Sequence, residues 1–389
     1  MAENQVVITV FGRDRPGLIA DITSLLAKFK INIVDIQQGV IQGLFQMFMI
    51  VDLSTGVLSY GELKNKMKKE GRKLDLEIDT APLSEYKPFR KKGAKDLYVA
   101  TVLARDRVGI VADISSILSD LGVNIEKTLL TARGDLISLE FLVDLSGKDY
   151  IKVKNALDKR GSEVGLDIVI QNEKRFKREK RLVVFDMDST IVDLEIIDEL
   201  AKAAGVEDEV KGITEEAMGG GLEFKEALRN RVRLLKGLPV SVLENVAENL
   251  ALTPGIEELL TALKSMGYKT ALISGGFTYF TDKLKERLNF DYAFANQLVI
   301  EDEKLMGELM EPIIDAEAKG EIILELARKE NISTENIVAV GDGANDQIMI
   351  ENAGLGVAFN AKELLKKVSD GSLSKENIIG LLNILGLED

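Results

Sequence analysis

The sequence contains no cysteine and no histidine, and these two absences exclude several kinds of functional site. Without cysteine there is no disulfide bond, no thiolate nucleophile and no zinc site built on cysteine. Without histidine there is no serine–histidine triad, no imidazole base and no histidine-ligated metal. An enzyme of this composition must move protons with Asp, Glu, Lys or Tyr. It must also hold a metal with oxygen atoms, which favours a hard ion such as Mg²⁺.

Long apolar runs and an excess of basic residues are also missing. No apolar run approaches the ~20 residues that cross a bilayer, and the first residues, MAENQVVITV, lack the features of a signal peptide. We therefore expect a cytoplasmic protein with no membrane segment. The net charge of −14 argues against nucleic-acid binding. One basic cluster, residues 174–181, is interpreted as an exposed linker rather than as a nucleic-acid-binding arm.

The first half of the chain contains an internal repeat. Residues 11–33 match residues 103–125 at an offset of 92 residues, the separation of Arg13 and Arg105. Each copy has an apolar strand-like run, a turn with glycine and an apolar stripe at helical spacing. Two strand-like runs follow, separated by IQGLF in one copy and ARGDL in the other, and then a second helix and a closing strand. This order predicts two α+β domains of ferredoxin-like βαββαβ type, each an antiparallel sheet with both helices on one face.

The repeat resembles the ACT domains, which are small amino-acid-sensing modules, in its R-D-R-x-G loop and in the Asn of the following turn. We expect these domains over residues 1–80 and 95–172, joined by a linker over residues 82–95. A helix N-terminus can receive a carboxylate, and the aspartate of each loop could meet an ammonium group. Helix capping by these two aspartates is the alternative interpretation. The candidate effector-binding residues are Asp14, Gly17, Asn32, Asp106, Gly109 and Asn124.

From residue 181 onward the pattern changes to strands that alternate with helices, which predicts a Rossmann-like, doubly wound parallel sheet over residues 181–389. The runs RLVVFD, KTALIS and NIVAVGD end at Asp186, Ser274 and Asp342. Ligands bind outside the carboxyl ends of such strands, so we expect these three residues to converge.

Asp186 and Asp188 are two residues apart and point to the same side of an extended strand end. Two close carboxylates repel each other, and a bound divalent cation relieves that repulsion. The pair can then divide its work, with Asp186 as nucleophile and Asp188 as proton carrier. Two aspartates that cap the following helix are the alternative for an isolated D-x-D motif.

The D-x-D motif does not stand alone. DMDSTIVD, LISGG, AKGEII and VGDGANDQIM occur in this order and resemble the four motifs of the haloacid dehalogenase-like phosphohydrolases over residues 181–380. The resemblance implies an aspartyl-phosphate formed on Asp186, with Asp188 as general acid and base. Further residues that it implies for the phosphoryl group and its surroundings are Ser274, Gly275, Lys319, Asn345 and Asp346. The implied Mg²⁺ ligands are Asp186, Asp342 and the main-chain carbonyl of Asp188.

A mostly helical insertion, about residues 197–253, follows the first strand and is expected to cap the site. Its sequence resembles the cap of the phosphoserine phosphatases. Glu195 and Arg231 have the charges needed for the ammonium and carboxylate groups of phosphoserine, and Met218 and Phe224 match positions that pack around the substrate. The resemblance implies hydrolysis of O-phospho-L-serine to L-serine and phosphate, the last step of serine biosynthesis. Phosphothreonine, a phosphosugar and a non-catalytic sensor are the alternatives.

The ACT resemblance also implies regulation and association. L-Serine, the expected product, is the expected effector of the ACT domains. ACT sheets often associate side by side, which predicts a homodimer, although pairing between the two tandem copies could serve instead.

Overall fold

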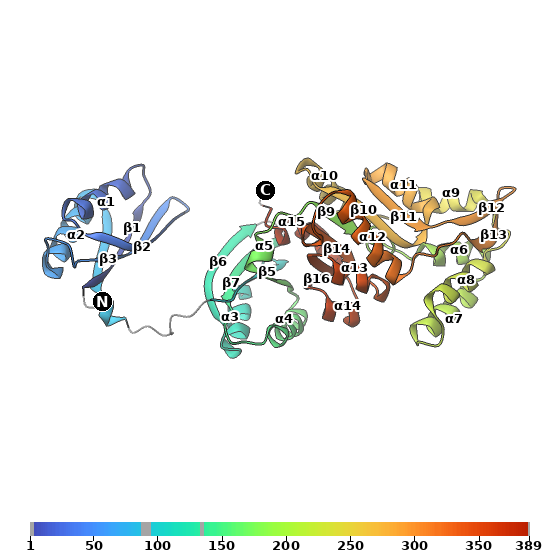
Figure 1. Cartoon of the computed structure of the whole chain (residues 1–389), viewed down its shortest axis with the longest axis horizontal. Coiled ribbons are helices and arrows are strands. Elements are labelled where there is room, and N and C mark those ends of the chain that lie inside the picture. Colours follow the sequence, from blue (N-terminus) through green and yellow to red (C-terminus); the bar gives the residue numbers. More distant parts are fainter. Residues whose placement is uncertain (1–3, 87–94, 133–135, 388–389) are drawn as a thin grey trace. The chain divides into compact units, whose positions relative to one another are not determined.

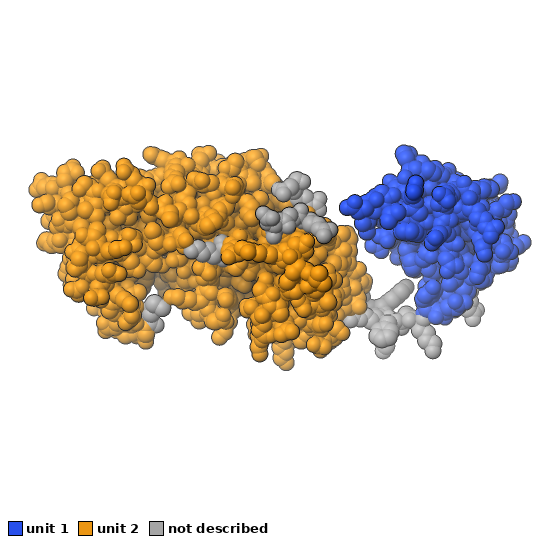
Figure 2. Space-filling model, turned by 180° about the vertical axis from the view of Figure 1, so that it is seen from behind, with its two compact units in different colours: residues 1–93 blue, residues 94–389 orange. Residues whose placement is uncertain are grey.

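The computed structural model describes residues 4–86, 95–132 and 136–387, apart from the side chains of Met218 and Lys375 (Figure 1). The chain forms two compact units, residues 1–93 and 94–389 (Figure 2). No helix within the described residues is both long enough and apolar enough to cross a membrane.

The first unit is a four-stranded antiparallel sheet with two helices. Its elements are β1 (Gln5–Arg13), α1 (Leu18–Lys28), β2 (Asn32–Ile41), β3 (Leu44–Asp52), α2 (Tyr60–Leu74), β4 (Leu76–Pro82) and the short η1 (Leu83–Glu85). The strand order is β2-β3-β1-β4. Apolar residues of both helices, including Ile22 and Met67, share one core with alternate residues of the strands. The predicted βαββαβ order is confirmed.

The second copy of the repeat has the same fold. Its elements are β5 (Leu97–Arg105), α3 (Ile110–Asp120), β6 (Asn124–Ala132), β7 (Leu136–Asp144), α4 (Tyr150–Val164) and β8 (Asp167–Asn172). The strands lie in the equivalent order β8-β5-β7-β6. The predicted break ARGDL contains residues 133–135, which lie outside the described residues.

The predicted parallel sheet follows. Its strands are β9 (Leu182–Phe185), β10 (Lys269–Phe277), β11 (Tyr292–Asn296), β14 (Ile337–Gly341), β15 (Leu355–Phe359) and β16 (Gly371–Leu373). Helices cover both faces, so the doubly wound fold is confirmed. One face packs against α10 (Ile256–Ser265) and α11 (Thr278–Leu288). The other packs against α12 (Ala316–Lys329), α13 (Gln347–Asn352) and α14 (Glu363–Val368).

Four helices form the cap between β9 and α10: α6 (Ile196–Ala204), α7 (Glu207–Met218), α8 (Phe224–Leu234) and α9 (Val240–Glu248). A hairpin of β12 (Leu298–Glu301) and β13 (Lys304–Leu309), which the sequence analysis did not predict, packs against α8. The remaining short elements are α5 (Glu173–Phe176), η2 (Thr334–Asn336), η3 (Ala344–Asp346), η4 (Lys375–Gly380) and α15 (Leu381–Ile384).

The second ACT-like sheet and the parallel sheet are continuous, which the sequence analysis did not anticipate. β16 pairs with β8 at Gly371 and Val169, giving one sheet of ten strands. A Cβ atom on Gly371 would lie 2.5 Å from Val169 Cα, so only glycine allows the two backbones to approach so closely. Residues of η4 and α15 then cover the face of this sheet that α3 and α4 leave open. Leu103 and Val169 are buried in one core with Ile378 and Leu381.

Among the described residues of the first unit, none covers the equivalent face of its sheet. Phe11, the counterpart of Leu103 in the repeat, is 46% exposed, whereas Leu103 is 1% exposed. Leu103 also packs against Gly380, where an added Cβ atom would lie 2.6 Å from its side chain.

Leu103→Ala is therefore expected to reduce the free energy of unfolding of the second unit by about 2–4 kcal/mol, because it empties a buried site between two domains. Phe11→Ala is the matched control in the first unit and should change stability by about 0.5 kcal/mol or less. Urea denaturation followed by circular dichroism measures both. Equal effects would contradict the packing described for Leu103.

Candidate active site

Three strand ends meet at one edge of the parallel sheet. Asp186 follows β9, Ser274 lies near the end of β10, and Asp342 follows β14. β9 pairs with both β10 and β14 in parallel register, so the three carboxyl ends are neighbours. The structure thus brings together the residues that the strand pattern predicted to converge.

A buried lysine lies at the centre of this edge. Lys319, on the first turn of α12, has no exposed side-chain surface. Its ammonium group donates hydrogen bonds to Asp186 Oδ1 at 2.5 Å and to Asp346 Oδ1 at 2.7 Å. Asp315 caps the helix, because its side chain accepts a hydrogen bond from Ala318 N at 2.9 Å, and this fixes the first turn.

Burial and the neighbouring opposite charges act against each other on the pKa values of Asp186 and Lys319. Burial, and then the nearby Asp346 carboxylate, raise the pKa of Asp186 well above its usual value, while Lys319 opposes the shift. Burial lowers the pKa of Lys319, but the two carboxylates outweigh it and the net pKa is raised. The lysine therefore remains charged.

Three carboxylates could hold a metal ion. Oxygen atoms of Asp186, Asp342 and Asp346 all lie within 4.8 Å of one another. Asp346 also shapes the loop, because its Oδ2 accepts hydrogen bonds from the main-chain N–H groups of Asp342 and Gly343, both at 3.1 Å. Burial, then Asp346 and Glu195, raise the pKa of Asp342 to about 7. A set of oxygen ligands whose mutual repulsion Lys319 offsets only in part is suited to a hard divalent cation.

Asp188 differs from Asp186 in its surroundings. Its Oδ1 accepts a hydrogen bond from Ile196 N at 2.9 Å, and its Oδ2 accepts one from Ser274 Oγ at 3.2 Å. Burial and then the charge of Glu195 raise the pKa of Asp188 to about 7. A carboxyl group with this pKa can both donate and accept a proton near neutrality.

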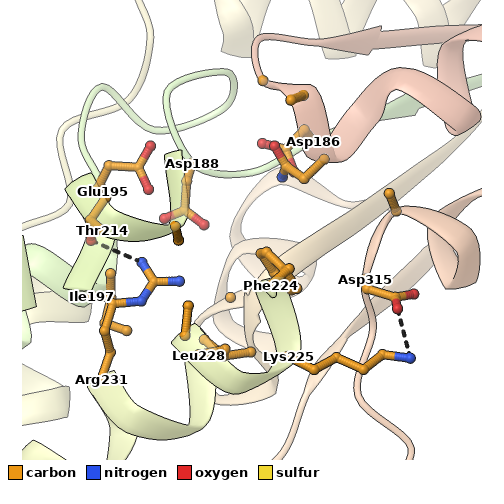
Figure 3. Close-up of a pocket in the computed structure, with 18 of the residues that line it drawn as sticks. Asp186, Asp188, Glu195, Ile197, Thr214, Phe224, Lys225, Leu228, Arg231 and Asp315 are labelled. Atoms are coloured by element: carbon orange, nitrogen blue, oxygen red, sulfur yellow. Dashed lines mark hydrogen bonds and ion pairs between the residues drawn. The ribbon is translucent and has the colours of Figure 1, made fainter. Parts of the chain in front are cut away.

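Asp186, Asp188 and Asp342 line a cavity of about 950 Å³ between the sheet edge and the cap. Figure 3 shows Glu195 and Arg231 on the cap side of the cavity and Asp186 on the sheet side, with Asp188 between Glu195 and Asp186. Phe224, on α8, also lines the cavity. Gly275 and Asn345 also line it. Gly275 leaves room for Phe224, whose ring would lie 3.1 Å from an added Cβ atom. The side chain of Met218, the remaining predicted substrate contact, lies outside the described residues.

The two charged groups on the cap side retain capacity for a ligand. Arg231 Nη1 donates a hydrogen bond to Thr214 Oγ1 at 3.5 Å. Its Nε is buried and has no hydrogen-bond partner among the described residues. Glu195 accepts a hydrogen bond from Ser189 Oγ at 3.1 Å, although burial still raises the pKa of Glu195. Ser189 has a φ of 58°, a left-handed conformation that a residue other than glycine adopts rarely.

Several residues of the site were not singled out from the sequence. Thr214 supports Arg231, and Lys225 on α8 forms an ion pair of 2.6 Å with Asp315, which joins the cap to α12 (Figure 3). Lys362 also lines the cavity. Thr214 begins the sequence TEEAMGG of the cap, residues 214–220, but nothing in that sequence shows that its hydroxyl group faces an arginine.

The predicted effector residues lie in two equivalent loops. α1 and α3 begin after Gly17 and Gly109, which adopt left-handed conformations and are themselves the N-cap residues. Asp14 and Asp106 lie three residues earlier, so neither aspartate occupies the N-cap position itself. Asp106 and Gly109 line a second cavity of about 680 Å³. Asn32 and Asn124 are the first residues of β2 and β6.

The chain is similar to proteins of known families. A haloacid dehalogenase-like hydrolase family model matches residues 180–354, and ACT domain models match residues 4–81 and 98–161. A phosphoserine phosphatase from Archaeoglobus fulgidus is 54% identical over 344 residues, 88% of this chain and 98% of that protein. One from Streptomyces coelicolor is 34% identical over 383 residues, 98% of this chain and 92% of that protein.

A solved structure is also similar. A HAD family hydrolase from Salmonella enterica serovar Typhi has a TM-score of 0.67 and 31% identity, covering 74% of this chain and 98% of that chain.

The cluster of Asp186, Asp342 and Asp346 predicts that Mg²⁺ binding stabilises the fold. At a hundredfold excess of Mg²⁺ over its dissociation constant, the stabilisation should be about 2.7 kcal/mol, seen as a rise in melting temperature over the same protein in EDTA. Asp342→Asn should lose most of this rise. Asp291→Asn is the control, because Asp291 pairs with Lys264 and is not part of the carboxylate cluster. This variant should keep the rise in melting temperature. An Mg²⁺ response that survives in Asp342→Asn would contradict the assignment.

Proposed function

Because this chain belongs to the phosphoserine phosphatase family of haloacid dehalogenase-like hydrolases, we propose that it hydrolyses O-phospho-L-serine to L-serine and phosphate. One observation supports phosphoserine in particular as the substrate. Glu195 and Arg231, with opposite charges, line the same cavity as Asp186 and Asp188. A substrate with an ammonium, a carboxylate and a phosphate group has a counterpart for each.

Binding would begin at the cap. The Arg231 guanidinium would pair with the substrate carboxylate, using the Nε that has no protein partner, and Glu195 would receive the ammonium group. The phosphate would then face Asp186, with Ser274 Oγ and the Gly275 N–H as hydrogen-bond donors. Lys319 would offset part of the charge of the phosphoryl group, which it can do without moving because Asp186 and Asp346 already hold it.

The reaction would take two steps. Asp186 attacks phosphorus and forms an aspartyl-phosphate, while the bond from phosphorus to the serine oxygen breaks and Asp188 gives its proton to that oxygen. Asp188 then takes a proton from a water molecule, which attacks the same phosphorus and releases phosphate and free Asp186. When bound, Mg²⁺ would supply charge neutralisation at the phosphoryl group. Asp186, Asp342 and Asp346 would hold it, with the main-chain carbonyl of Asp188 as a further ligand.

The other domains complete the proposal. We assign residues 1–80 and 95–172 to two ACT domains and residues 181–389 to the catalytic domain. L-Serine binding at the loops of Asp14 and Asp106 would couple product concentration to activity, in the last step of serine biosynthesis. A homodimer formed through ACT sheets is proposed on the same grounds.

Asp186→Asn should reduce phosphate release from phosphoserine to background, because an amide is not a nucleophile here. The wild-type enzyme quenched in acid during turnover should carry a phosphoryl group on the peptide that contains Asp186, detected by mass spectrometry. Asp188→Asn should slow release by about 10²- to 10⁴-fold, as expected for loss of a general acid. Full turnover by Asp186→Asn would show that this carboxylate is not the nucleophile.

Glu195→Gln should reduce kcat/KM for phosphoserine by roughly 10- to 100-fold, the effect of losing a charge-assisted contact. With a phosphorylated hydroxy acid that lacks the ammonium group, kcat/KM of the same variant should differ little from that of the wild type. A panel with phosphothreonine and a phosphosugar tests the alternative substrates, and Glu226→Gln, an exposed acid on α8, is the control. Equal losses with and without the ammonium group would mean that Glu195 does not recognise it.

A further inference from the structure

The segment of residues 362–374, which contains α14 and β16, lies between the catalytic cavity and the second ACT domain. At its beginning, Lys362, Leu364 and Leu365 line the cavity. α14 also packs against η3, which carries Asn345 and Asp346. Figure 1 shows α14 next to α4. One short helix thus forms part of the cavity wall at one end and faces another domain at the other.

The second ACT domain holds the far end of this segment at three places. Lys154 Nζ, from α4, donates a hydrogen bond to the main-chain oxygen of Lys366, near the end of α14, at 2.9 Å. Ile170 N donates to the oxygen of Asp370 at 3.3 Å, and Ser374 N donates to the Asp167 side chain at 2.9 Å. Of the three contacts, only that of Lys154 reaches α14 itself. Ser369 Oγ donates to the same Lys366 oxygen at 3.1 Å.

Lys154 is a buried charge. Its side chain is 3% exposed and pairs with Asp158 at 2.5 Å, one turn further along α4. Lysine is almost never fully buried in proteins unless its charge is paired. The environment of Lys154 therefore requires both Asp158 and the carbonyl oxygen of α14.

The internal repeat provides a comparison within the chain. α2 and α4 both have 15 residues and start at a tyrosine, so Lys64 and Lys154 occupy the same position. Lys64 is exposed, and the residue equivalent to Asp158 is Lys68, which is also exposed. The buried pair is therefore a feature of the second copy alone, at the point where that copy meets the catalytic domain.

We propose that Lys154 is a positioning residue for the catalytic cavity, acting through α14. By binding the Lys366 carbonyl oxygen, it fixes the helix whose first turn lines the cavity. The second ACT domain therefore supports the substrate site directly, and a change in α4 on binding of an amino acid would reach the cavity through this contact. This positioning role rests on the proposed function in one respect, namely that phosphoserine is the substrate used to test it.

Lys154→Met removes the charge and leaves an unbranched side chain that is one atom shorter. We expect it to raise KM for phosphoserine on the order of tenfold, with a smaller change in kcat, because none of the reacting groups is on α14. Lys64→Met, the matched control in the first ACT domain, should leave both constants unchanged. Leu103→Ala, which loosens the same interface away from α14, should lower stability without raising KM.

Hydrogen exchange of the amides in residues 363–368 gives a readout that needs no substrate. Exchange should be faster in Lys154→Met and unchanged in Lys64→Met. If Lys154→Met does not fold, Asp158→Asn replaces it and should shift both readouts in the same direction by less. An unchanged KM and unchanged exchange in a folded variant would overturn the proposal, as would an equal rise in KM in Leu103→Ala. Absence of phosphoserine turnover in the wild type would instead contradict the proposed function.

Discussion

Lys319 places a positive charge between Asp186 and Asp346 in the interior of the second unit, with no side-chain surface exposed to solvent. Such a charge is tolerated only with partners, because the low dielectric of the interior makes an unpaired ion very costly. The arrangement fixes three elements at once: the end of β9, the first turn of α12 and the loop after β14. Removing Lys319 would leave Asp186 and Asp346 as uncompensated buried charges.

The surrounding backbone is adapted to this cluster. A Cβ atom on Gly341 would lie 2.5 Å from Asp346 Oδ2, and one on Gly320 would lie 2.4 Å from Ile348. These glycines let α12 and the loop after β14 approach closely enough for the carboxylates to gather. The same cluster explains why a cation fits here, since one ammonium group does not balance all of the acidic groups that lie around it.

Much of this arrangement could be predicted from the sequence because its causes are local. The apolar runs before Asp186, Ser274 and Asp342 specify strands, and parallel strands bring their carboxyl ends to one edge. The repeat indicated two βαββαβ domains because each copy has its own periodicity and turns. Lys319 was indicated only by its place among four ordered motifs, because the local sequence of a helix does not show whether one of its lysines is buried.

The contacts between domains could not be predicted in this way. β16 has only three residues, Gly-Ser-Leu, and no apolar pattern that announces a strand, so its pairing with β8 was missed. The basic run before β9 was interpreted as an exposed linker, and most of it is exposed. Lys180, however, is 6% exposed and donates hydrogen bonds to the main-chain oxygens of Arg175 and Glu335. The apolar periodicity of a strand or helix does not show which face of a sheet a segment distant in the sequence will cover.

The cover over Leu103 has a consequence for the order in which the chain folds during translation. The first ACT domain has a core made entirely from its own residues, so it can fold as soon as it leaves the ribosome. The second also has a core of its own residues, but the opposite face of its sheet, at Leu103 and Val169, packs against Ile378, Leu381 and Ile384, which are synthesised some two hundred residues after β8. That face of its sheet is therefore covered only when the catalytic domain is almost complete. Two copies of one sequence pattern would thus complete their packing at different stages of synthesis.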